Sequence, residues 1–297
     1  MAGVAPAVLL VDKPGGMTSH DVVARARRAF GTRKIGHAGT LDPMATGLLV
    51  LGVEGATRLL TFIVGLDKTY EATIRLGVAT DSDDADGQVT RQTDASSLAS
   101  DAIETALQPL RGRISQVPSS VSAIKVGGRR AYDLARAGEE VELAAREVEV
   151  TRLDVVAQRR DGPTIDLDVV VDCSSGTYIR ALARDLGAAL GVGGHLTALR
   201  RTRIGPFVVE DAGTVDALDA ARGLDPAAAA SAVLGRFEVT ADEARDLRHG
   251  KRLAGAAVRL PSHPAAAIGP DGVLVGIVEK RGADVKSAMN MPAEASR

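Results

Sequence analysis

The sequence has a single cysteine, Cys173, among its 297 residues. One thiol excludes an internal disulfide and any zinc site built from several cysteines. The five histidines are scattered through the chain and show no metal-ligand spacing. We therefore expect no metal in the function of this protein.

Long apolar runs are also lacking. None approaches the roughly 18 residues of a membrane-spanning helix, and the N-terminus has no basic segment followed by an apolar core, so no signal peptide is expected. A cytoplasmic location follows. Apolar residues make up 45% of the chain and charged residues 25%, which is typical of a globular protein. The length allows one large domain, or a large domain and a small one.

The chain also has no excess of positive charge, because its net charge is −2. Taken alone, this value argues against nucleic-acid binding, which relies on Lys and Arg contacts to phosphate. The basic residues nevertheless gather in three clusters, at 25–34, 111–130 and 200–203. A basic face on a near-neutral protein is the footprint of a polyanion partner, although surface arginines also serve solubility. The acidic segment 81–87 is predicted to be a solvated turn.

The segment 36–49 reads GHAGTLDPMATGLL and places Asp42 directly before Pro43. An Asp-Pro pair flanked by glycines favours a tight turn between two ordered elements. No acidic residue lies between Asp21 and Asp42, so this carboxylate ends a cationic run that would keep it ionised and attract a polyanion. A carboxylate acting alone can attack an anomeric carbon or stabilise charge there, which permits glycosidic chemistry on nucleic acid. A structural Asp-Pro turn is the alternative.

Hydrophobic periodicity predicts the elements that carry the other candidate residues. Strict alternation predicts strands at 68–77, with Tyr70 near the start, and at 163–173. Tyr178 and Arg180 fall in the first turn of a helix after the second strand, and Leu199 falls on a strand at 195–209. We also predict a strand at 7–11, a helix capped by Ser19, a strand at 48–53, helices at 56–64, 99–110 and 132–137, a linker at 225–231, and a small β-rich module from 237.

The segment GHAGTLDPMATGLL resembles the signature of the TruB family of tRNA pseudouridine synthases, which isomerise the T-loop uridine known as position 55. Other segments resemble that family in its own order, and a chance match of one motif would not bring the rest with it. These segments are LLVDKPGGMTSHDVV at 9–23, KTYEATIRLG at 68–77, TDSDDADG at 80–87, SAIK at 122–125, CSSGTYIRALARDLG at 173–187 and HLTALRR at 195–201. The resemblance covers about residues 7 to 210.

The resemblance implies a pseudouridine synthase fold of the α/β (α+β) class. In it a mixed, largely antiparallel central sheet is flanked by helices and followed by a small, β-rich PUA-like domain. The catalytic domain would span 1–230, with a thumb insertion at 117–147 that grips the T arm. The RNA-binding C-terminal domain would span 237–297.

The resemblance also assigns roles residue by residue. Asp42 would be the catalytic aspartate, and Arg180 would pair with it. Tyr70 would stack on the target uracil, while Tyr178 and Leu199 would line the base pocket. His37 would fill the gap left when nucleotides swing out of the T loop, which lowers the cost of unstacking the target base.

The family's reaction needs no cofactor, and the implied partner is tRNA, bound by a monomer without an obligatory protein partner. Whether the aspartate forms a covalent sugar adduct or removes a sugar proton stays open at this stage. The group that takes the C5 proton is open too, with Tyr70 as a candidate. Two other readings remain: a protein that helps tRNA to fold, as a separate or additional role, and a related synthase that works with a guide RNA.

Overall fold

The computed structural model describes residues 4–119, 125–126, 129–130, 143–218 and 223–292. The predicted helix at 132–137 and most of the SAIK segment lie outside these residues. The chain contacts divide it into two compact units. Unit 1 comprises Met1–Pro43, Gly47–Gly65 and Gly205–Arg297, and unit 2 comprises Met44–Thr46 and Leu66–Ile204. The boundary predicted at 230–237 between two domains stays a prediction.

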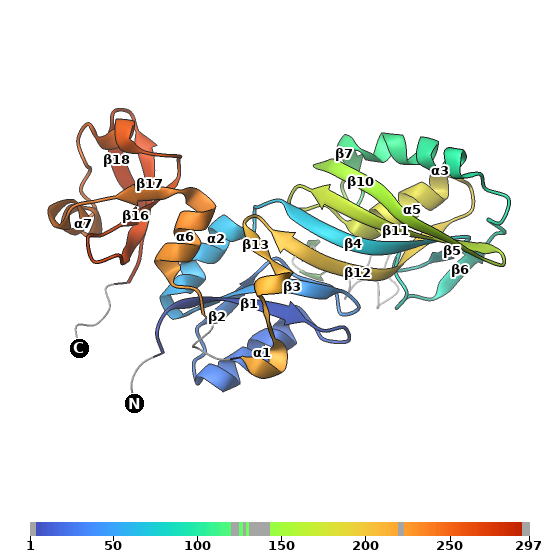
Figure 1. Cartoon of the computed structure of the whole chain (residues 1–297), viewed down its shortest axis with the longest axis horizontal. Coiled ribbons are helices and arrows are strands. Elements are labelled where there is room, and N and C mark those ends of the chain that lie inside the picture. The colour runs from blue at the N-terminus through green and yellow to red at the C-terminus, as the bar shows by residue number, and fades with distance from the viewer. Residues whose placement is uncertain (1–3, 120–124, 127–128, 131–142, 219–222, 293–297) are drawn as a thin grey trace. The chain divides into compact units, whose positions relative to one another are not determined.

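The strands in the N-terminal part of unit 1 pair in both parallel and antiparallel directions (Figure 1). Strand β1 (Ala7–Lys13) pairs antiparallel with β3 (Thr46–Val53) and parallel with β14 (Gly213–Thr214), while β2 (Ile35–Ala38) pairs with β3. Helix α1 (Ser19–Phe30) buries its apolar stripe in the core that these strands share. The remaining short elements here are η1 (Glu54–Leu59), α2 (Leu60–Ile63), β13 (Phe207–Val208), η3 (Val209–Asp211) and η4 (Val215–Ala217).

Helix α1 is capped by Thr18, so the prediction that Ser19 caps it is wrong. The Thr18 hydroxyl accepts a hydrogen bond from the Asp21 N–H at 3.1 Å, and the Asp21 carboxylate accepts one from the Thr18 N–H at 2.9 Å. This reciprocal capping box satisfies two helix N–H groups at once. Ser19 is therefore the first residue of the helix, and its buried hydroxyl is available for another contact.

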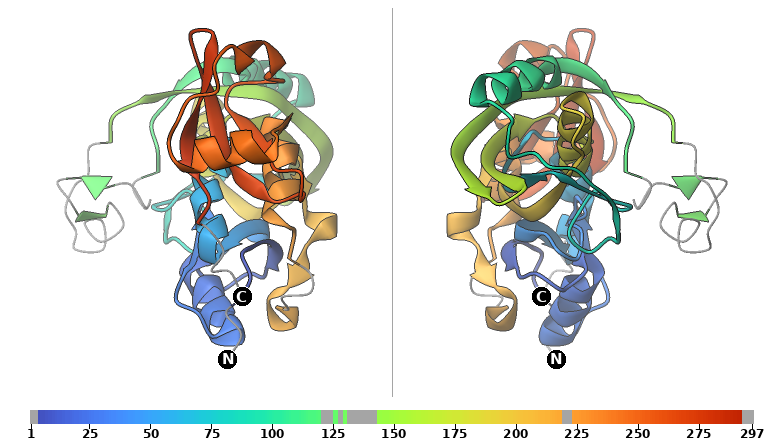
Figure 2. Two further views of the ribbon diagram at one scale, coloured as in Figure 1. Left: turned by 90° about the vertical axis from the view of Figure 1, so that its left-hand side faces the viewer. Right: turned by 90° about the vertical axis from the view of Figure 1, so that its right-hand side faces the viewer.

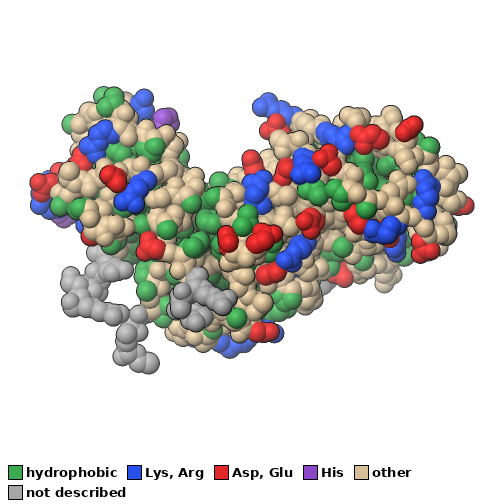
Figure 3. Space-filling view, viewed as in Figure 1, with side chains coloured by type: hydrophobic (Ala, Val, Ile, Leu, Met, Phe, Trp, Pro, Cys, Tyr) green, Lys and Arg blue, Asp and Glu red, His purple; other side chains and the backbone are tan. Residues whose placement is uncertain are grey.

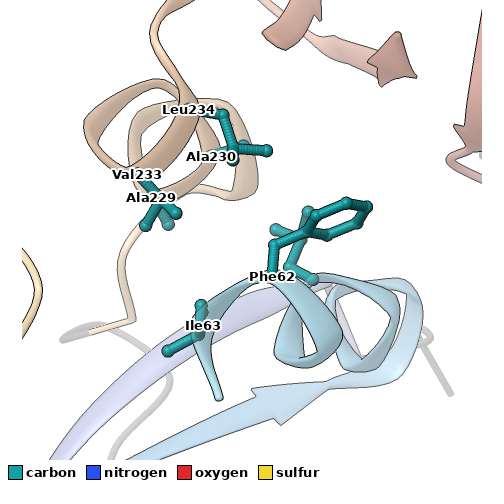
Figure 4. A pocket seen from close by; sticks show the side chains of 7 residues that line it. Phe62, Ile63, Ala229, Ala230, Val233 and Leu234 are labelled. Atoms are coloured by element: carbon teal, nitrogen blue, oxygen red, sulfur yellow. The ribbon is translucent and has the colours of Figure 1, made fainter. Parts of the chain in front are cut away.

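The linker predicted at 225–231 is wrong, because residues Pro226–Leu234 form helix α6. Asp225 caps it by accepting a hydrogen bond from the Ala227 N–H at 2.7 Å, and a proline suits the first helical position. The alanine-rich sequence is a helix former rather than a flexible tether. Figure 4 shows a small hollow between α6 and the segment of η1 and α2, lined only by apolar side chains: Leu59, Phe62, Ile63, Ala229, Ala230, Val233 and Leu234.

The β-rich C-terminal module is confirmed. Its four strands pair in the order β15, β16, β17, β18, and helix α7 (Ala241–Arg248) packs on them. The module buries its own apolar core, which includes Phe237, Leu247 and Val285. Its elements are β15 (Arg236–Glu238), η6 (Ala256–Arg259), β16 (Ala265–Ile268), β17 (Leu274–Arg281) and β18 (Asp284–Asn290).

Unit 2 contains an antiparallel sheet whose strands follow the order β12, β4, β11, β10, β7. The strands predicted from alternation are confirmed at β4 (Lys68–Leu76) and β11 (Thr164–Cys173), where buried positions alternate with less buried ones. Figure 2 shows β10 and β11 arching together, and bulges interrupt their register twice. Such bulges increase local twist. The other strands of this sheet are β7 (Gly112–Gln116), β10 (Arg146–Asp161) and β12 (Gly194–Ile204).

Two helices accompany the sheet of unit 2 (Figure 1). Helix α5 (Ile179–Ala189) packs against β12 and β4, and helix α3 (Ser100–Leu107) contacts α5. The mixed α/β class with largely antiparallel strands is thereby confirmed. The remaining elements are β5 (Val78–Thr80), β6 (Val89–Gln92), η2 (Gln108–Leu110), β8 (Lys125–Val126) and β9 (Arg129–Arg130).

Helix α5 approaches the start of β12 so closely that Gly187 has no room for a side chain. The carbonyl of Gly187 accepts hydrogen bonds from the N–H groups of Val192 at 3.1 Å and Gly193 at 2.9 Å. A Cβ atom on Gly187 would lie 2.1 Å from the nitrogen of Gly194. This close approach fixes α5, whose first turn carries Arg180, against the strand that carries Leu199.

We predict that Gly187→Ala destabilises the protein, although the same change in an ordinary helix stabilises it by up to about 1 kcal/mol. Because the new methyl group meets backbone atoms, the free energy of unfolding should fall by roughly 2 kcal/mol or more. Urea unfolding followed by circular dichroism measures the change. Gly65→Ala is the matched control, since a Cβ there meets nothing within 4 Å. A stabilised Gly187→Ala variant would contradict the packing described.

Candidate active site

Asp42 lies in a loop, residues 39–45, between β2 and β3, as predicted. The residues on both sides of it are tied to the rest of unit 1 through their backbones. The Ser19 hydroxyl accepts a hydrogen bond from the Leu41 N–H at 2.9 Å and donates one to the Leu41 carbonyl at 3.2 Å. The Pro43 carbonyl accepts a hydrogen bond from the Gly16 N–H at 2.8 Å. Asp42 is half-buried between these two anchors.

Lys13 is a fully buried cation beneath this loop. Its ammonium group donates hydrogen bonds to the carbonyls of Met17 at 2.7 Å, Pro14 at 2.9 Å and Pro43 at 3.3 Å. A buried charge is tolerated only when its hydrogen bonds are satisfied, and these three carbonyls match the three donors of an ammonium group. Lys13 therefore joins the turn after β1 to the residue that follows Asp42.

His37 lies on β2, shortly before the Asp42 loop. Its ring meets the ring of His20 edge-on, with centroids 5.5 Å apart and an interplanar angle of 82°. His20 belongs to the first turn of α1, next to Ser19. The first turn of α1 therefore supports both His37 and the backbone beside Asp42.

Tyr70 and Leu199 lie on the adjacent strands β4 and β12 of unit 2. In their register Tyr70 is opposite Arg201, and Leu199 is opposite Ala72. Residues directly opposite in an antiparallel pair share a face, so Tyr70, Arg201 and Leu199 form one cluster. All three are buried, and Arg201 is only 1% exposed. A tyrosine face beside an apolar side chain and a cation is a suitable surface for a planar base.

Tyr178 and Arg180 begin helix α5, as predicted. Tyr178 is the N-cap residue, and its side chain is partly exposed. The Arg180 guanidinium is 4% exposed and donates from Nη1 to the Ser82 carbonyl and to Asp84 Oδ2, both at 3.0 Å. The buried pair with Asp84 holds the arginine head group in one orientation.

The solvated turn predicted at 81–87 is wrong, because Ser82, Asp83 and Asp84 are all buried. Asp84 faces Arg180. Asp83 accepts a hydrogen bond from the Ser119 hydroxyl at 2.7 Å and pairs with Arg184 at 3.3 Å. Burial raises the pKa of Asp83, although Ser119 and Arg184 oppose that shift. The carboxylates of this turn are therefore paired with arginines of α5 and are not solvated.

Lys68, at the start of β4, is a second buried lysine. It lies opposite Cys173 on β11 and opposite Ile204 on β12, and its amino group donates to the Leu66 carbonyl. Burial, with a smaller contribution from the nearby Arg201, lowers the pKa of Lys68 from 10.5 to about 8. Burial likewise raises the pKa of the Cys173 thiol to about 11, so that thiol stays protonated at neutral pH.

The basic cluster at 25–34 is partly engaged within unit 1. Arg25 pairs with Asp216 at 2.8 Å, Arg27 donates to a backbone carbonyl at 3.0 Å, and Lys34 lies 3.4 Å from Glu54. Arg28 and Arg33 are exposed. These two side chains are the members of the cluster best placed to meet phosphate.

The other two predicted basic clusters are less available than the sequence indicates. Arg111 pairs with Glu104 at 2.6 Å, Arg201 is buried, and Arg203 lies 3.5 Å from Asp172. Figure 3 shows Lys and Arg side chains interspersed with Asp and Glu over the strands of unit 2. Arg75 with Asp166 and Arg159 with Asp168 are such pairs. The side chains of Lys125, Arg129 and Arg130 lie outside the described residues.

The six predicted site residues are divided between the units. Unit 1 carries Asp42 and His37, and unit 2 carries the other four: Tyr70 on β4, Leu199 on β12, and Tyr178 and Arg180 at the start of α5. The predicted pairing of Arg180 with Asp42 stays a prediction, and the partner described for Arg180 is Asp84.

Sequence reasoning did not single out the supporting groups Lys13, Asp84, Arg201 and Gln116. Arg201 had a usable signal, since it follows Leu199 by two residues on the same strand face. The acidic excess at 81–87 was a weaker signal for Asp84. Gln116 had none, because the residue that it contacts lies 62 positions along the chain.

Within the described ranges, no group of three or more His, Cys, Asp or Glu side chains is close enough to hold a metal ion. In the same ranges, no helix has the length and apolar character needed to cross a membrane.

Three family profiles match consecutive parts of the chain. They are described as TruB family pseudouridylate synthase (N terminal domain) over 27–179, tRNA pseudouridylate synthase B C-terminal domain over 180–233, and tRNA pseudouridine synthase II, C terminal, over 234–292. The chain is 54% identical to the tRNA pseudouridine synthase B of Leifsonia xyli subsp. xyli, with 99% of both chains covered. It is 55% identical to that of Mycolicibacterium paratuberculosis, with 96% of this chain and 97% of the relative covered.

Solved structures with a similar fold include a Cbf5-Nop10-Gar1 complex. The match has a TM-score of 0.67 at 26% identity and covers 92% of this chain and 78% of that one. A second is an H/ACA RNP bound to a substrate RNA containing 2'-deoxyuridine, with a TM-score of 0.69 at 24% identity, covering 96% and 84%. The predicted pseudouridine synthase fold is thereby confirmed.

We predict that titration of Lys68 makes the free energy of unfolding depend on pH in the alkaline range. Its pKa in the folded protein, about 8, lies below the unfolded value of 10.5. Between these values the unfolded chain binds more protons, so the free energy of unfolding increases with pH. Relative to Lys68→Met, wild type should gain about 2 to 3 kcal/mol between pH 7 and pH 10 in urea unfolding. Lys280→Met, at an exposed position on β17, controls for the loss of a lysine. A constant difference between wild type and Lys68→Met would rule out this titration.

Proposed function

The chain belongs to the TruB family of pseudouridine synthases, and from this premise we propose that it converts uridine 55 in the T loop of tRNA to pseudouridine. The observation that carries the proposal is the near full-length similarity to bacterial proteins named tRNA pseudouridine synthase B. The proposed enzyme acts as a monomer in the cytoplasm on free tRNA, without a cofactor or an obligatory protein partner.

Asp42 is the catalytic aspartate in this proposal. During isomerisation the bond between the uracil N1 and the sugar C1' breaks, the uracil turns, and C5 bonds to the same carbon and loses its proton. A carboxylate can assist either by attacking C1' or by removing a sugar proton, and the two routes share the need for an ionised, well-placed oxygen. The anchoring of Leu41 and Pro43 on either side supports this role, because a nucleophile or base must be held in position.

The base pocket is proposed to contain Tyr70, Leu199 and Tyr178. The uracil would stack on Tyr70, with Leu199 as an apolar wall, as suits a base extruded from its stack. His37 would fill the space that the base vacates. Tyr70 is also the candidate for taking the C5 proton.

Arg180 is proposed to pair with Asp42 in addition to Asp84. Its described bonds to Ser82 and Asp84 both use Nη1. A guanidinium has five N–H donors, so a second carboxylate is compatible with these bonds. Such a pair would keep the catalytic carboxylate ionised and orient it.

Two alternatives from the same family context are separable by experiment. A guide-RNA-dependent synthase would leave a bare tRNA transcript unmodified, whereas the proposed enzyme modifies it. A tRNA-folding role would survive loss of catalysis, so an inactive variant that still accelerates tRNA folding would show that both functions are present.

We predict that Asp42→Asn abolishes pseudouridine formation, lowering the single-turnover rate by roughly 10³-fold or more, because the amide is neither a base nor a useful nucleophile. The dissociation constant for tRNA should change by less than about threefold, since the fold and the RNA contacts remain. Mapping of pseudouridine in unmodified tRNA transcript measures the product and its position. Asp101→Asn, in the exposed first turn of α3, is the matched control. Turnover by Asp42→Asn would remove Asp42 from the mechanism, and product at another uridine would refute position 55.

We predict that tRNA binding weakens steeply with salt, with a slope of several units in log K against log salt concentration. Arg28→Ala and Arg33→Ala should each reduce the magnitude of that slope by about 1 if these exposed side chains contact phosphate. Filter binding from 50 to 300 mM KCl measures the slope. Arg281→Ala, which removes a side chain paired with Glu279 on β17, serves as the control. An unchanged slope in both test variants would exclude the 25–34 cluster from the RNA interface.

A further inference from the structure

Gln116, the last residue of β7, makes a paired contact with the backbone of Tyr178. Its side-chain Nε2 donates to the Tyr178 carbonyl at 3.0 Å, and its Oε1 accepts from the Tyr178 N–H at 2.8 Å. Gln116 is 1% exposed. Both ends of a buried amide are thus satisfied by a single residue that lies far along the chain.

This contact holds the backbone of Tyr178 and so sets the direction in which its side chain leaves the chain. The N–H and the carbonyl of one residue belong to the two peptide planes on either side of its Cα. Holding both planes fixes φ and ψ, and with them the Cα–Cβ bond. Tyr178 is the N-cap of α5, and its own side chain provides no cap. Gln116 therefore supplies an acceptor that the start of this helix lacks.

Gln116 is itself held in place by its neighbours. Its backbone is in register with Arg146 on β10. The next residue, Val117, accepts a hydrogen bond through its carbonyl from Arg184 of α5 at 2.7 Å. Ser119 donates to the buried Asp83 at 2.7 Å. These bonds hold the backbone that carries the Gln116 side chain in place.

We infer that Gln116 is a positioning residue for the reaction, which it serves by orienting Tyr178 in the base pocket. This inference rests on the proposed function, because it takes Tyr178 to contact the uracil. Gln116 itself touches no substrate. Its loss should therefore slow the reaction of bound RNA and leave RNA binding nearly unchanged.

The kinetic test uses Gln116→Met, which keeps the length of the side chain but removes both the donor to the Tyr178 carbonyl and the acceptor for its N–H. The single-turnover rate at saturating tRNA should fall about tenfold, equivalent to about 1.4 kcal/mol, with the dissociation constant for tRNA within twofold. Ser115→Ala, at the exposed neighbouring position of β7, is the control. In a Tyr178→Ala background the effect of Gln116→Met should vanish, since the group that Gln116 positions is gone. A full tenfold effect in that background would overturn the inference.

A spectroscopic test is independent of activity. The chain has only 3 tyrosines, so 3-fluorotyrosine labelling gives three ¹⁹F resonances, assigned by Tyr→Phe variants. Gln116→Met and Gln116→Ala should shift or broaden the Tyr178 resonance and leave that of Tyr70 unchanged. An unchanged Tyr178 resonance, or equal disturbance of Tyr70, would overturn the inference. If wild type makes no pseudouridine in tRNA, the proposed function fails, while the ¹⁹F spectra still decide whether Gln116 orients Tyr178.

Discussion

The buried ammonium of Lys13 is the interaction on which the Asp42 loop depends. It donates hydrogen bonds to two backbone carbonyls in the turn after β1 and to the Pro43 carbonyl, and so connects residues that are far apart in the sequence. Ser19 acts in the same way on Leu41 through both its N–H and its carbonyl. A loop without regular secondary structure is thus held by side chains in place of a ladder of backbone bonds. The half-buried carboxylate between the two anchors is presented on a backbone that has few alternative conformations.

In unit 2, buried polar contacts also hold side chains in position, and here they include an ion pair between Arg180 and Asp84. Burying the Arg180 and Asp84 head groups carries a desolvation cost that their attraction offsets only with good geometry, so such a pair is weak evidence for stability. Its consequence is orientation, because the hydrogen bonds to Asp84 and to the Ser82 carbonyl hold the guanidinium in one direction. Gln116 gives Tyr178 a comparable constraint through the backbone. The first turn of α5 therefore carries two residues whose directions are set by partners outside the helix.

Periodicity was enough to predict the elements that bury one face. Strands β4 and β11 alternate over nine and ten residues, and α5 follows its apolar stripe. It failed where local composition resembled a loop. Residues 225–231 looked like a linker, but Asp225 and Pro226 begin a helix that buries Ala227, Ala229 and Ala230. The acidic turn looked solvated because the arginines that cover it come from a helix about 100 residues away. The site residues came from a resemblance of motifs, whereas Gln116 and Asp84 act through long-range contacts that no local pattern encodes.

The cations of this protein have two tasks, to shape the site and to attract RNA, and the sequence alone does not distinguish them. The cations of the chain include buried ones that shape the site, such as Arg180, Arg201 and Lys13, and exposed ones such as Arg28 and Arg33. Interactions between buried charges are little screened by salt. Interactions between exposed charges are largely screened at separations beyond about 10 Å at 0.1 M ionic strength. The arrangement of the buried side chains should therefore persist at ionic strengths that weaken the attraction between the exposed cations and RNA.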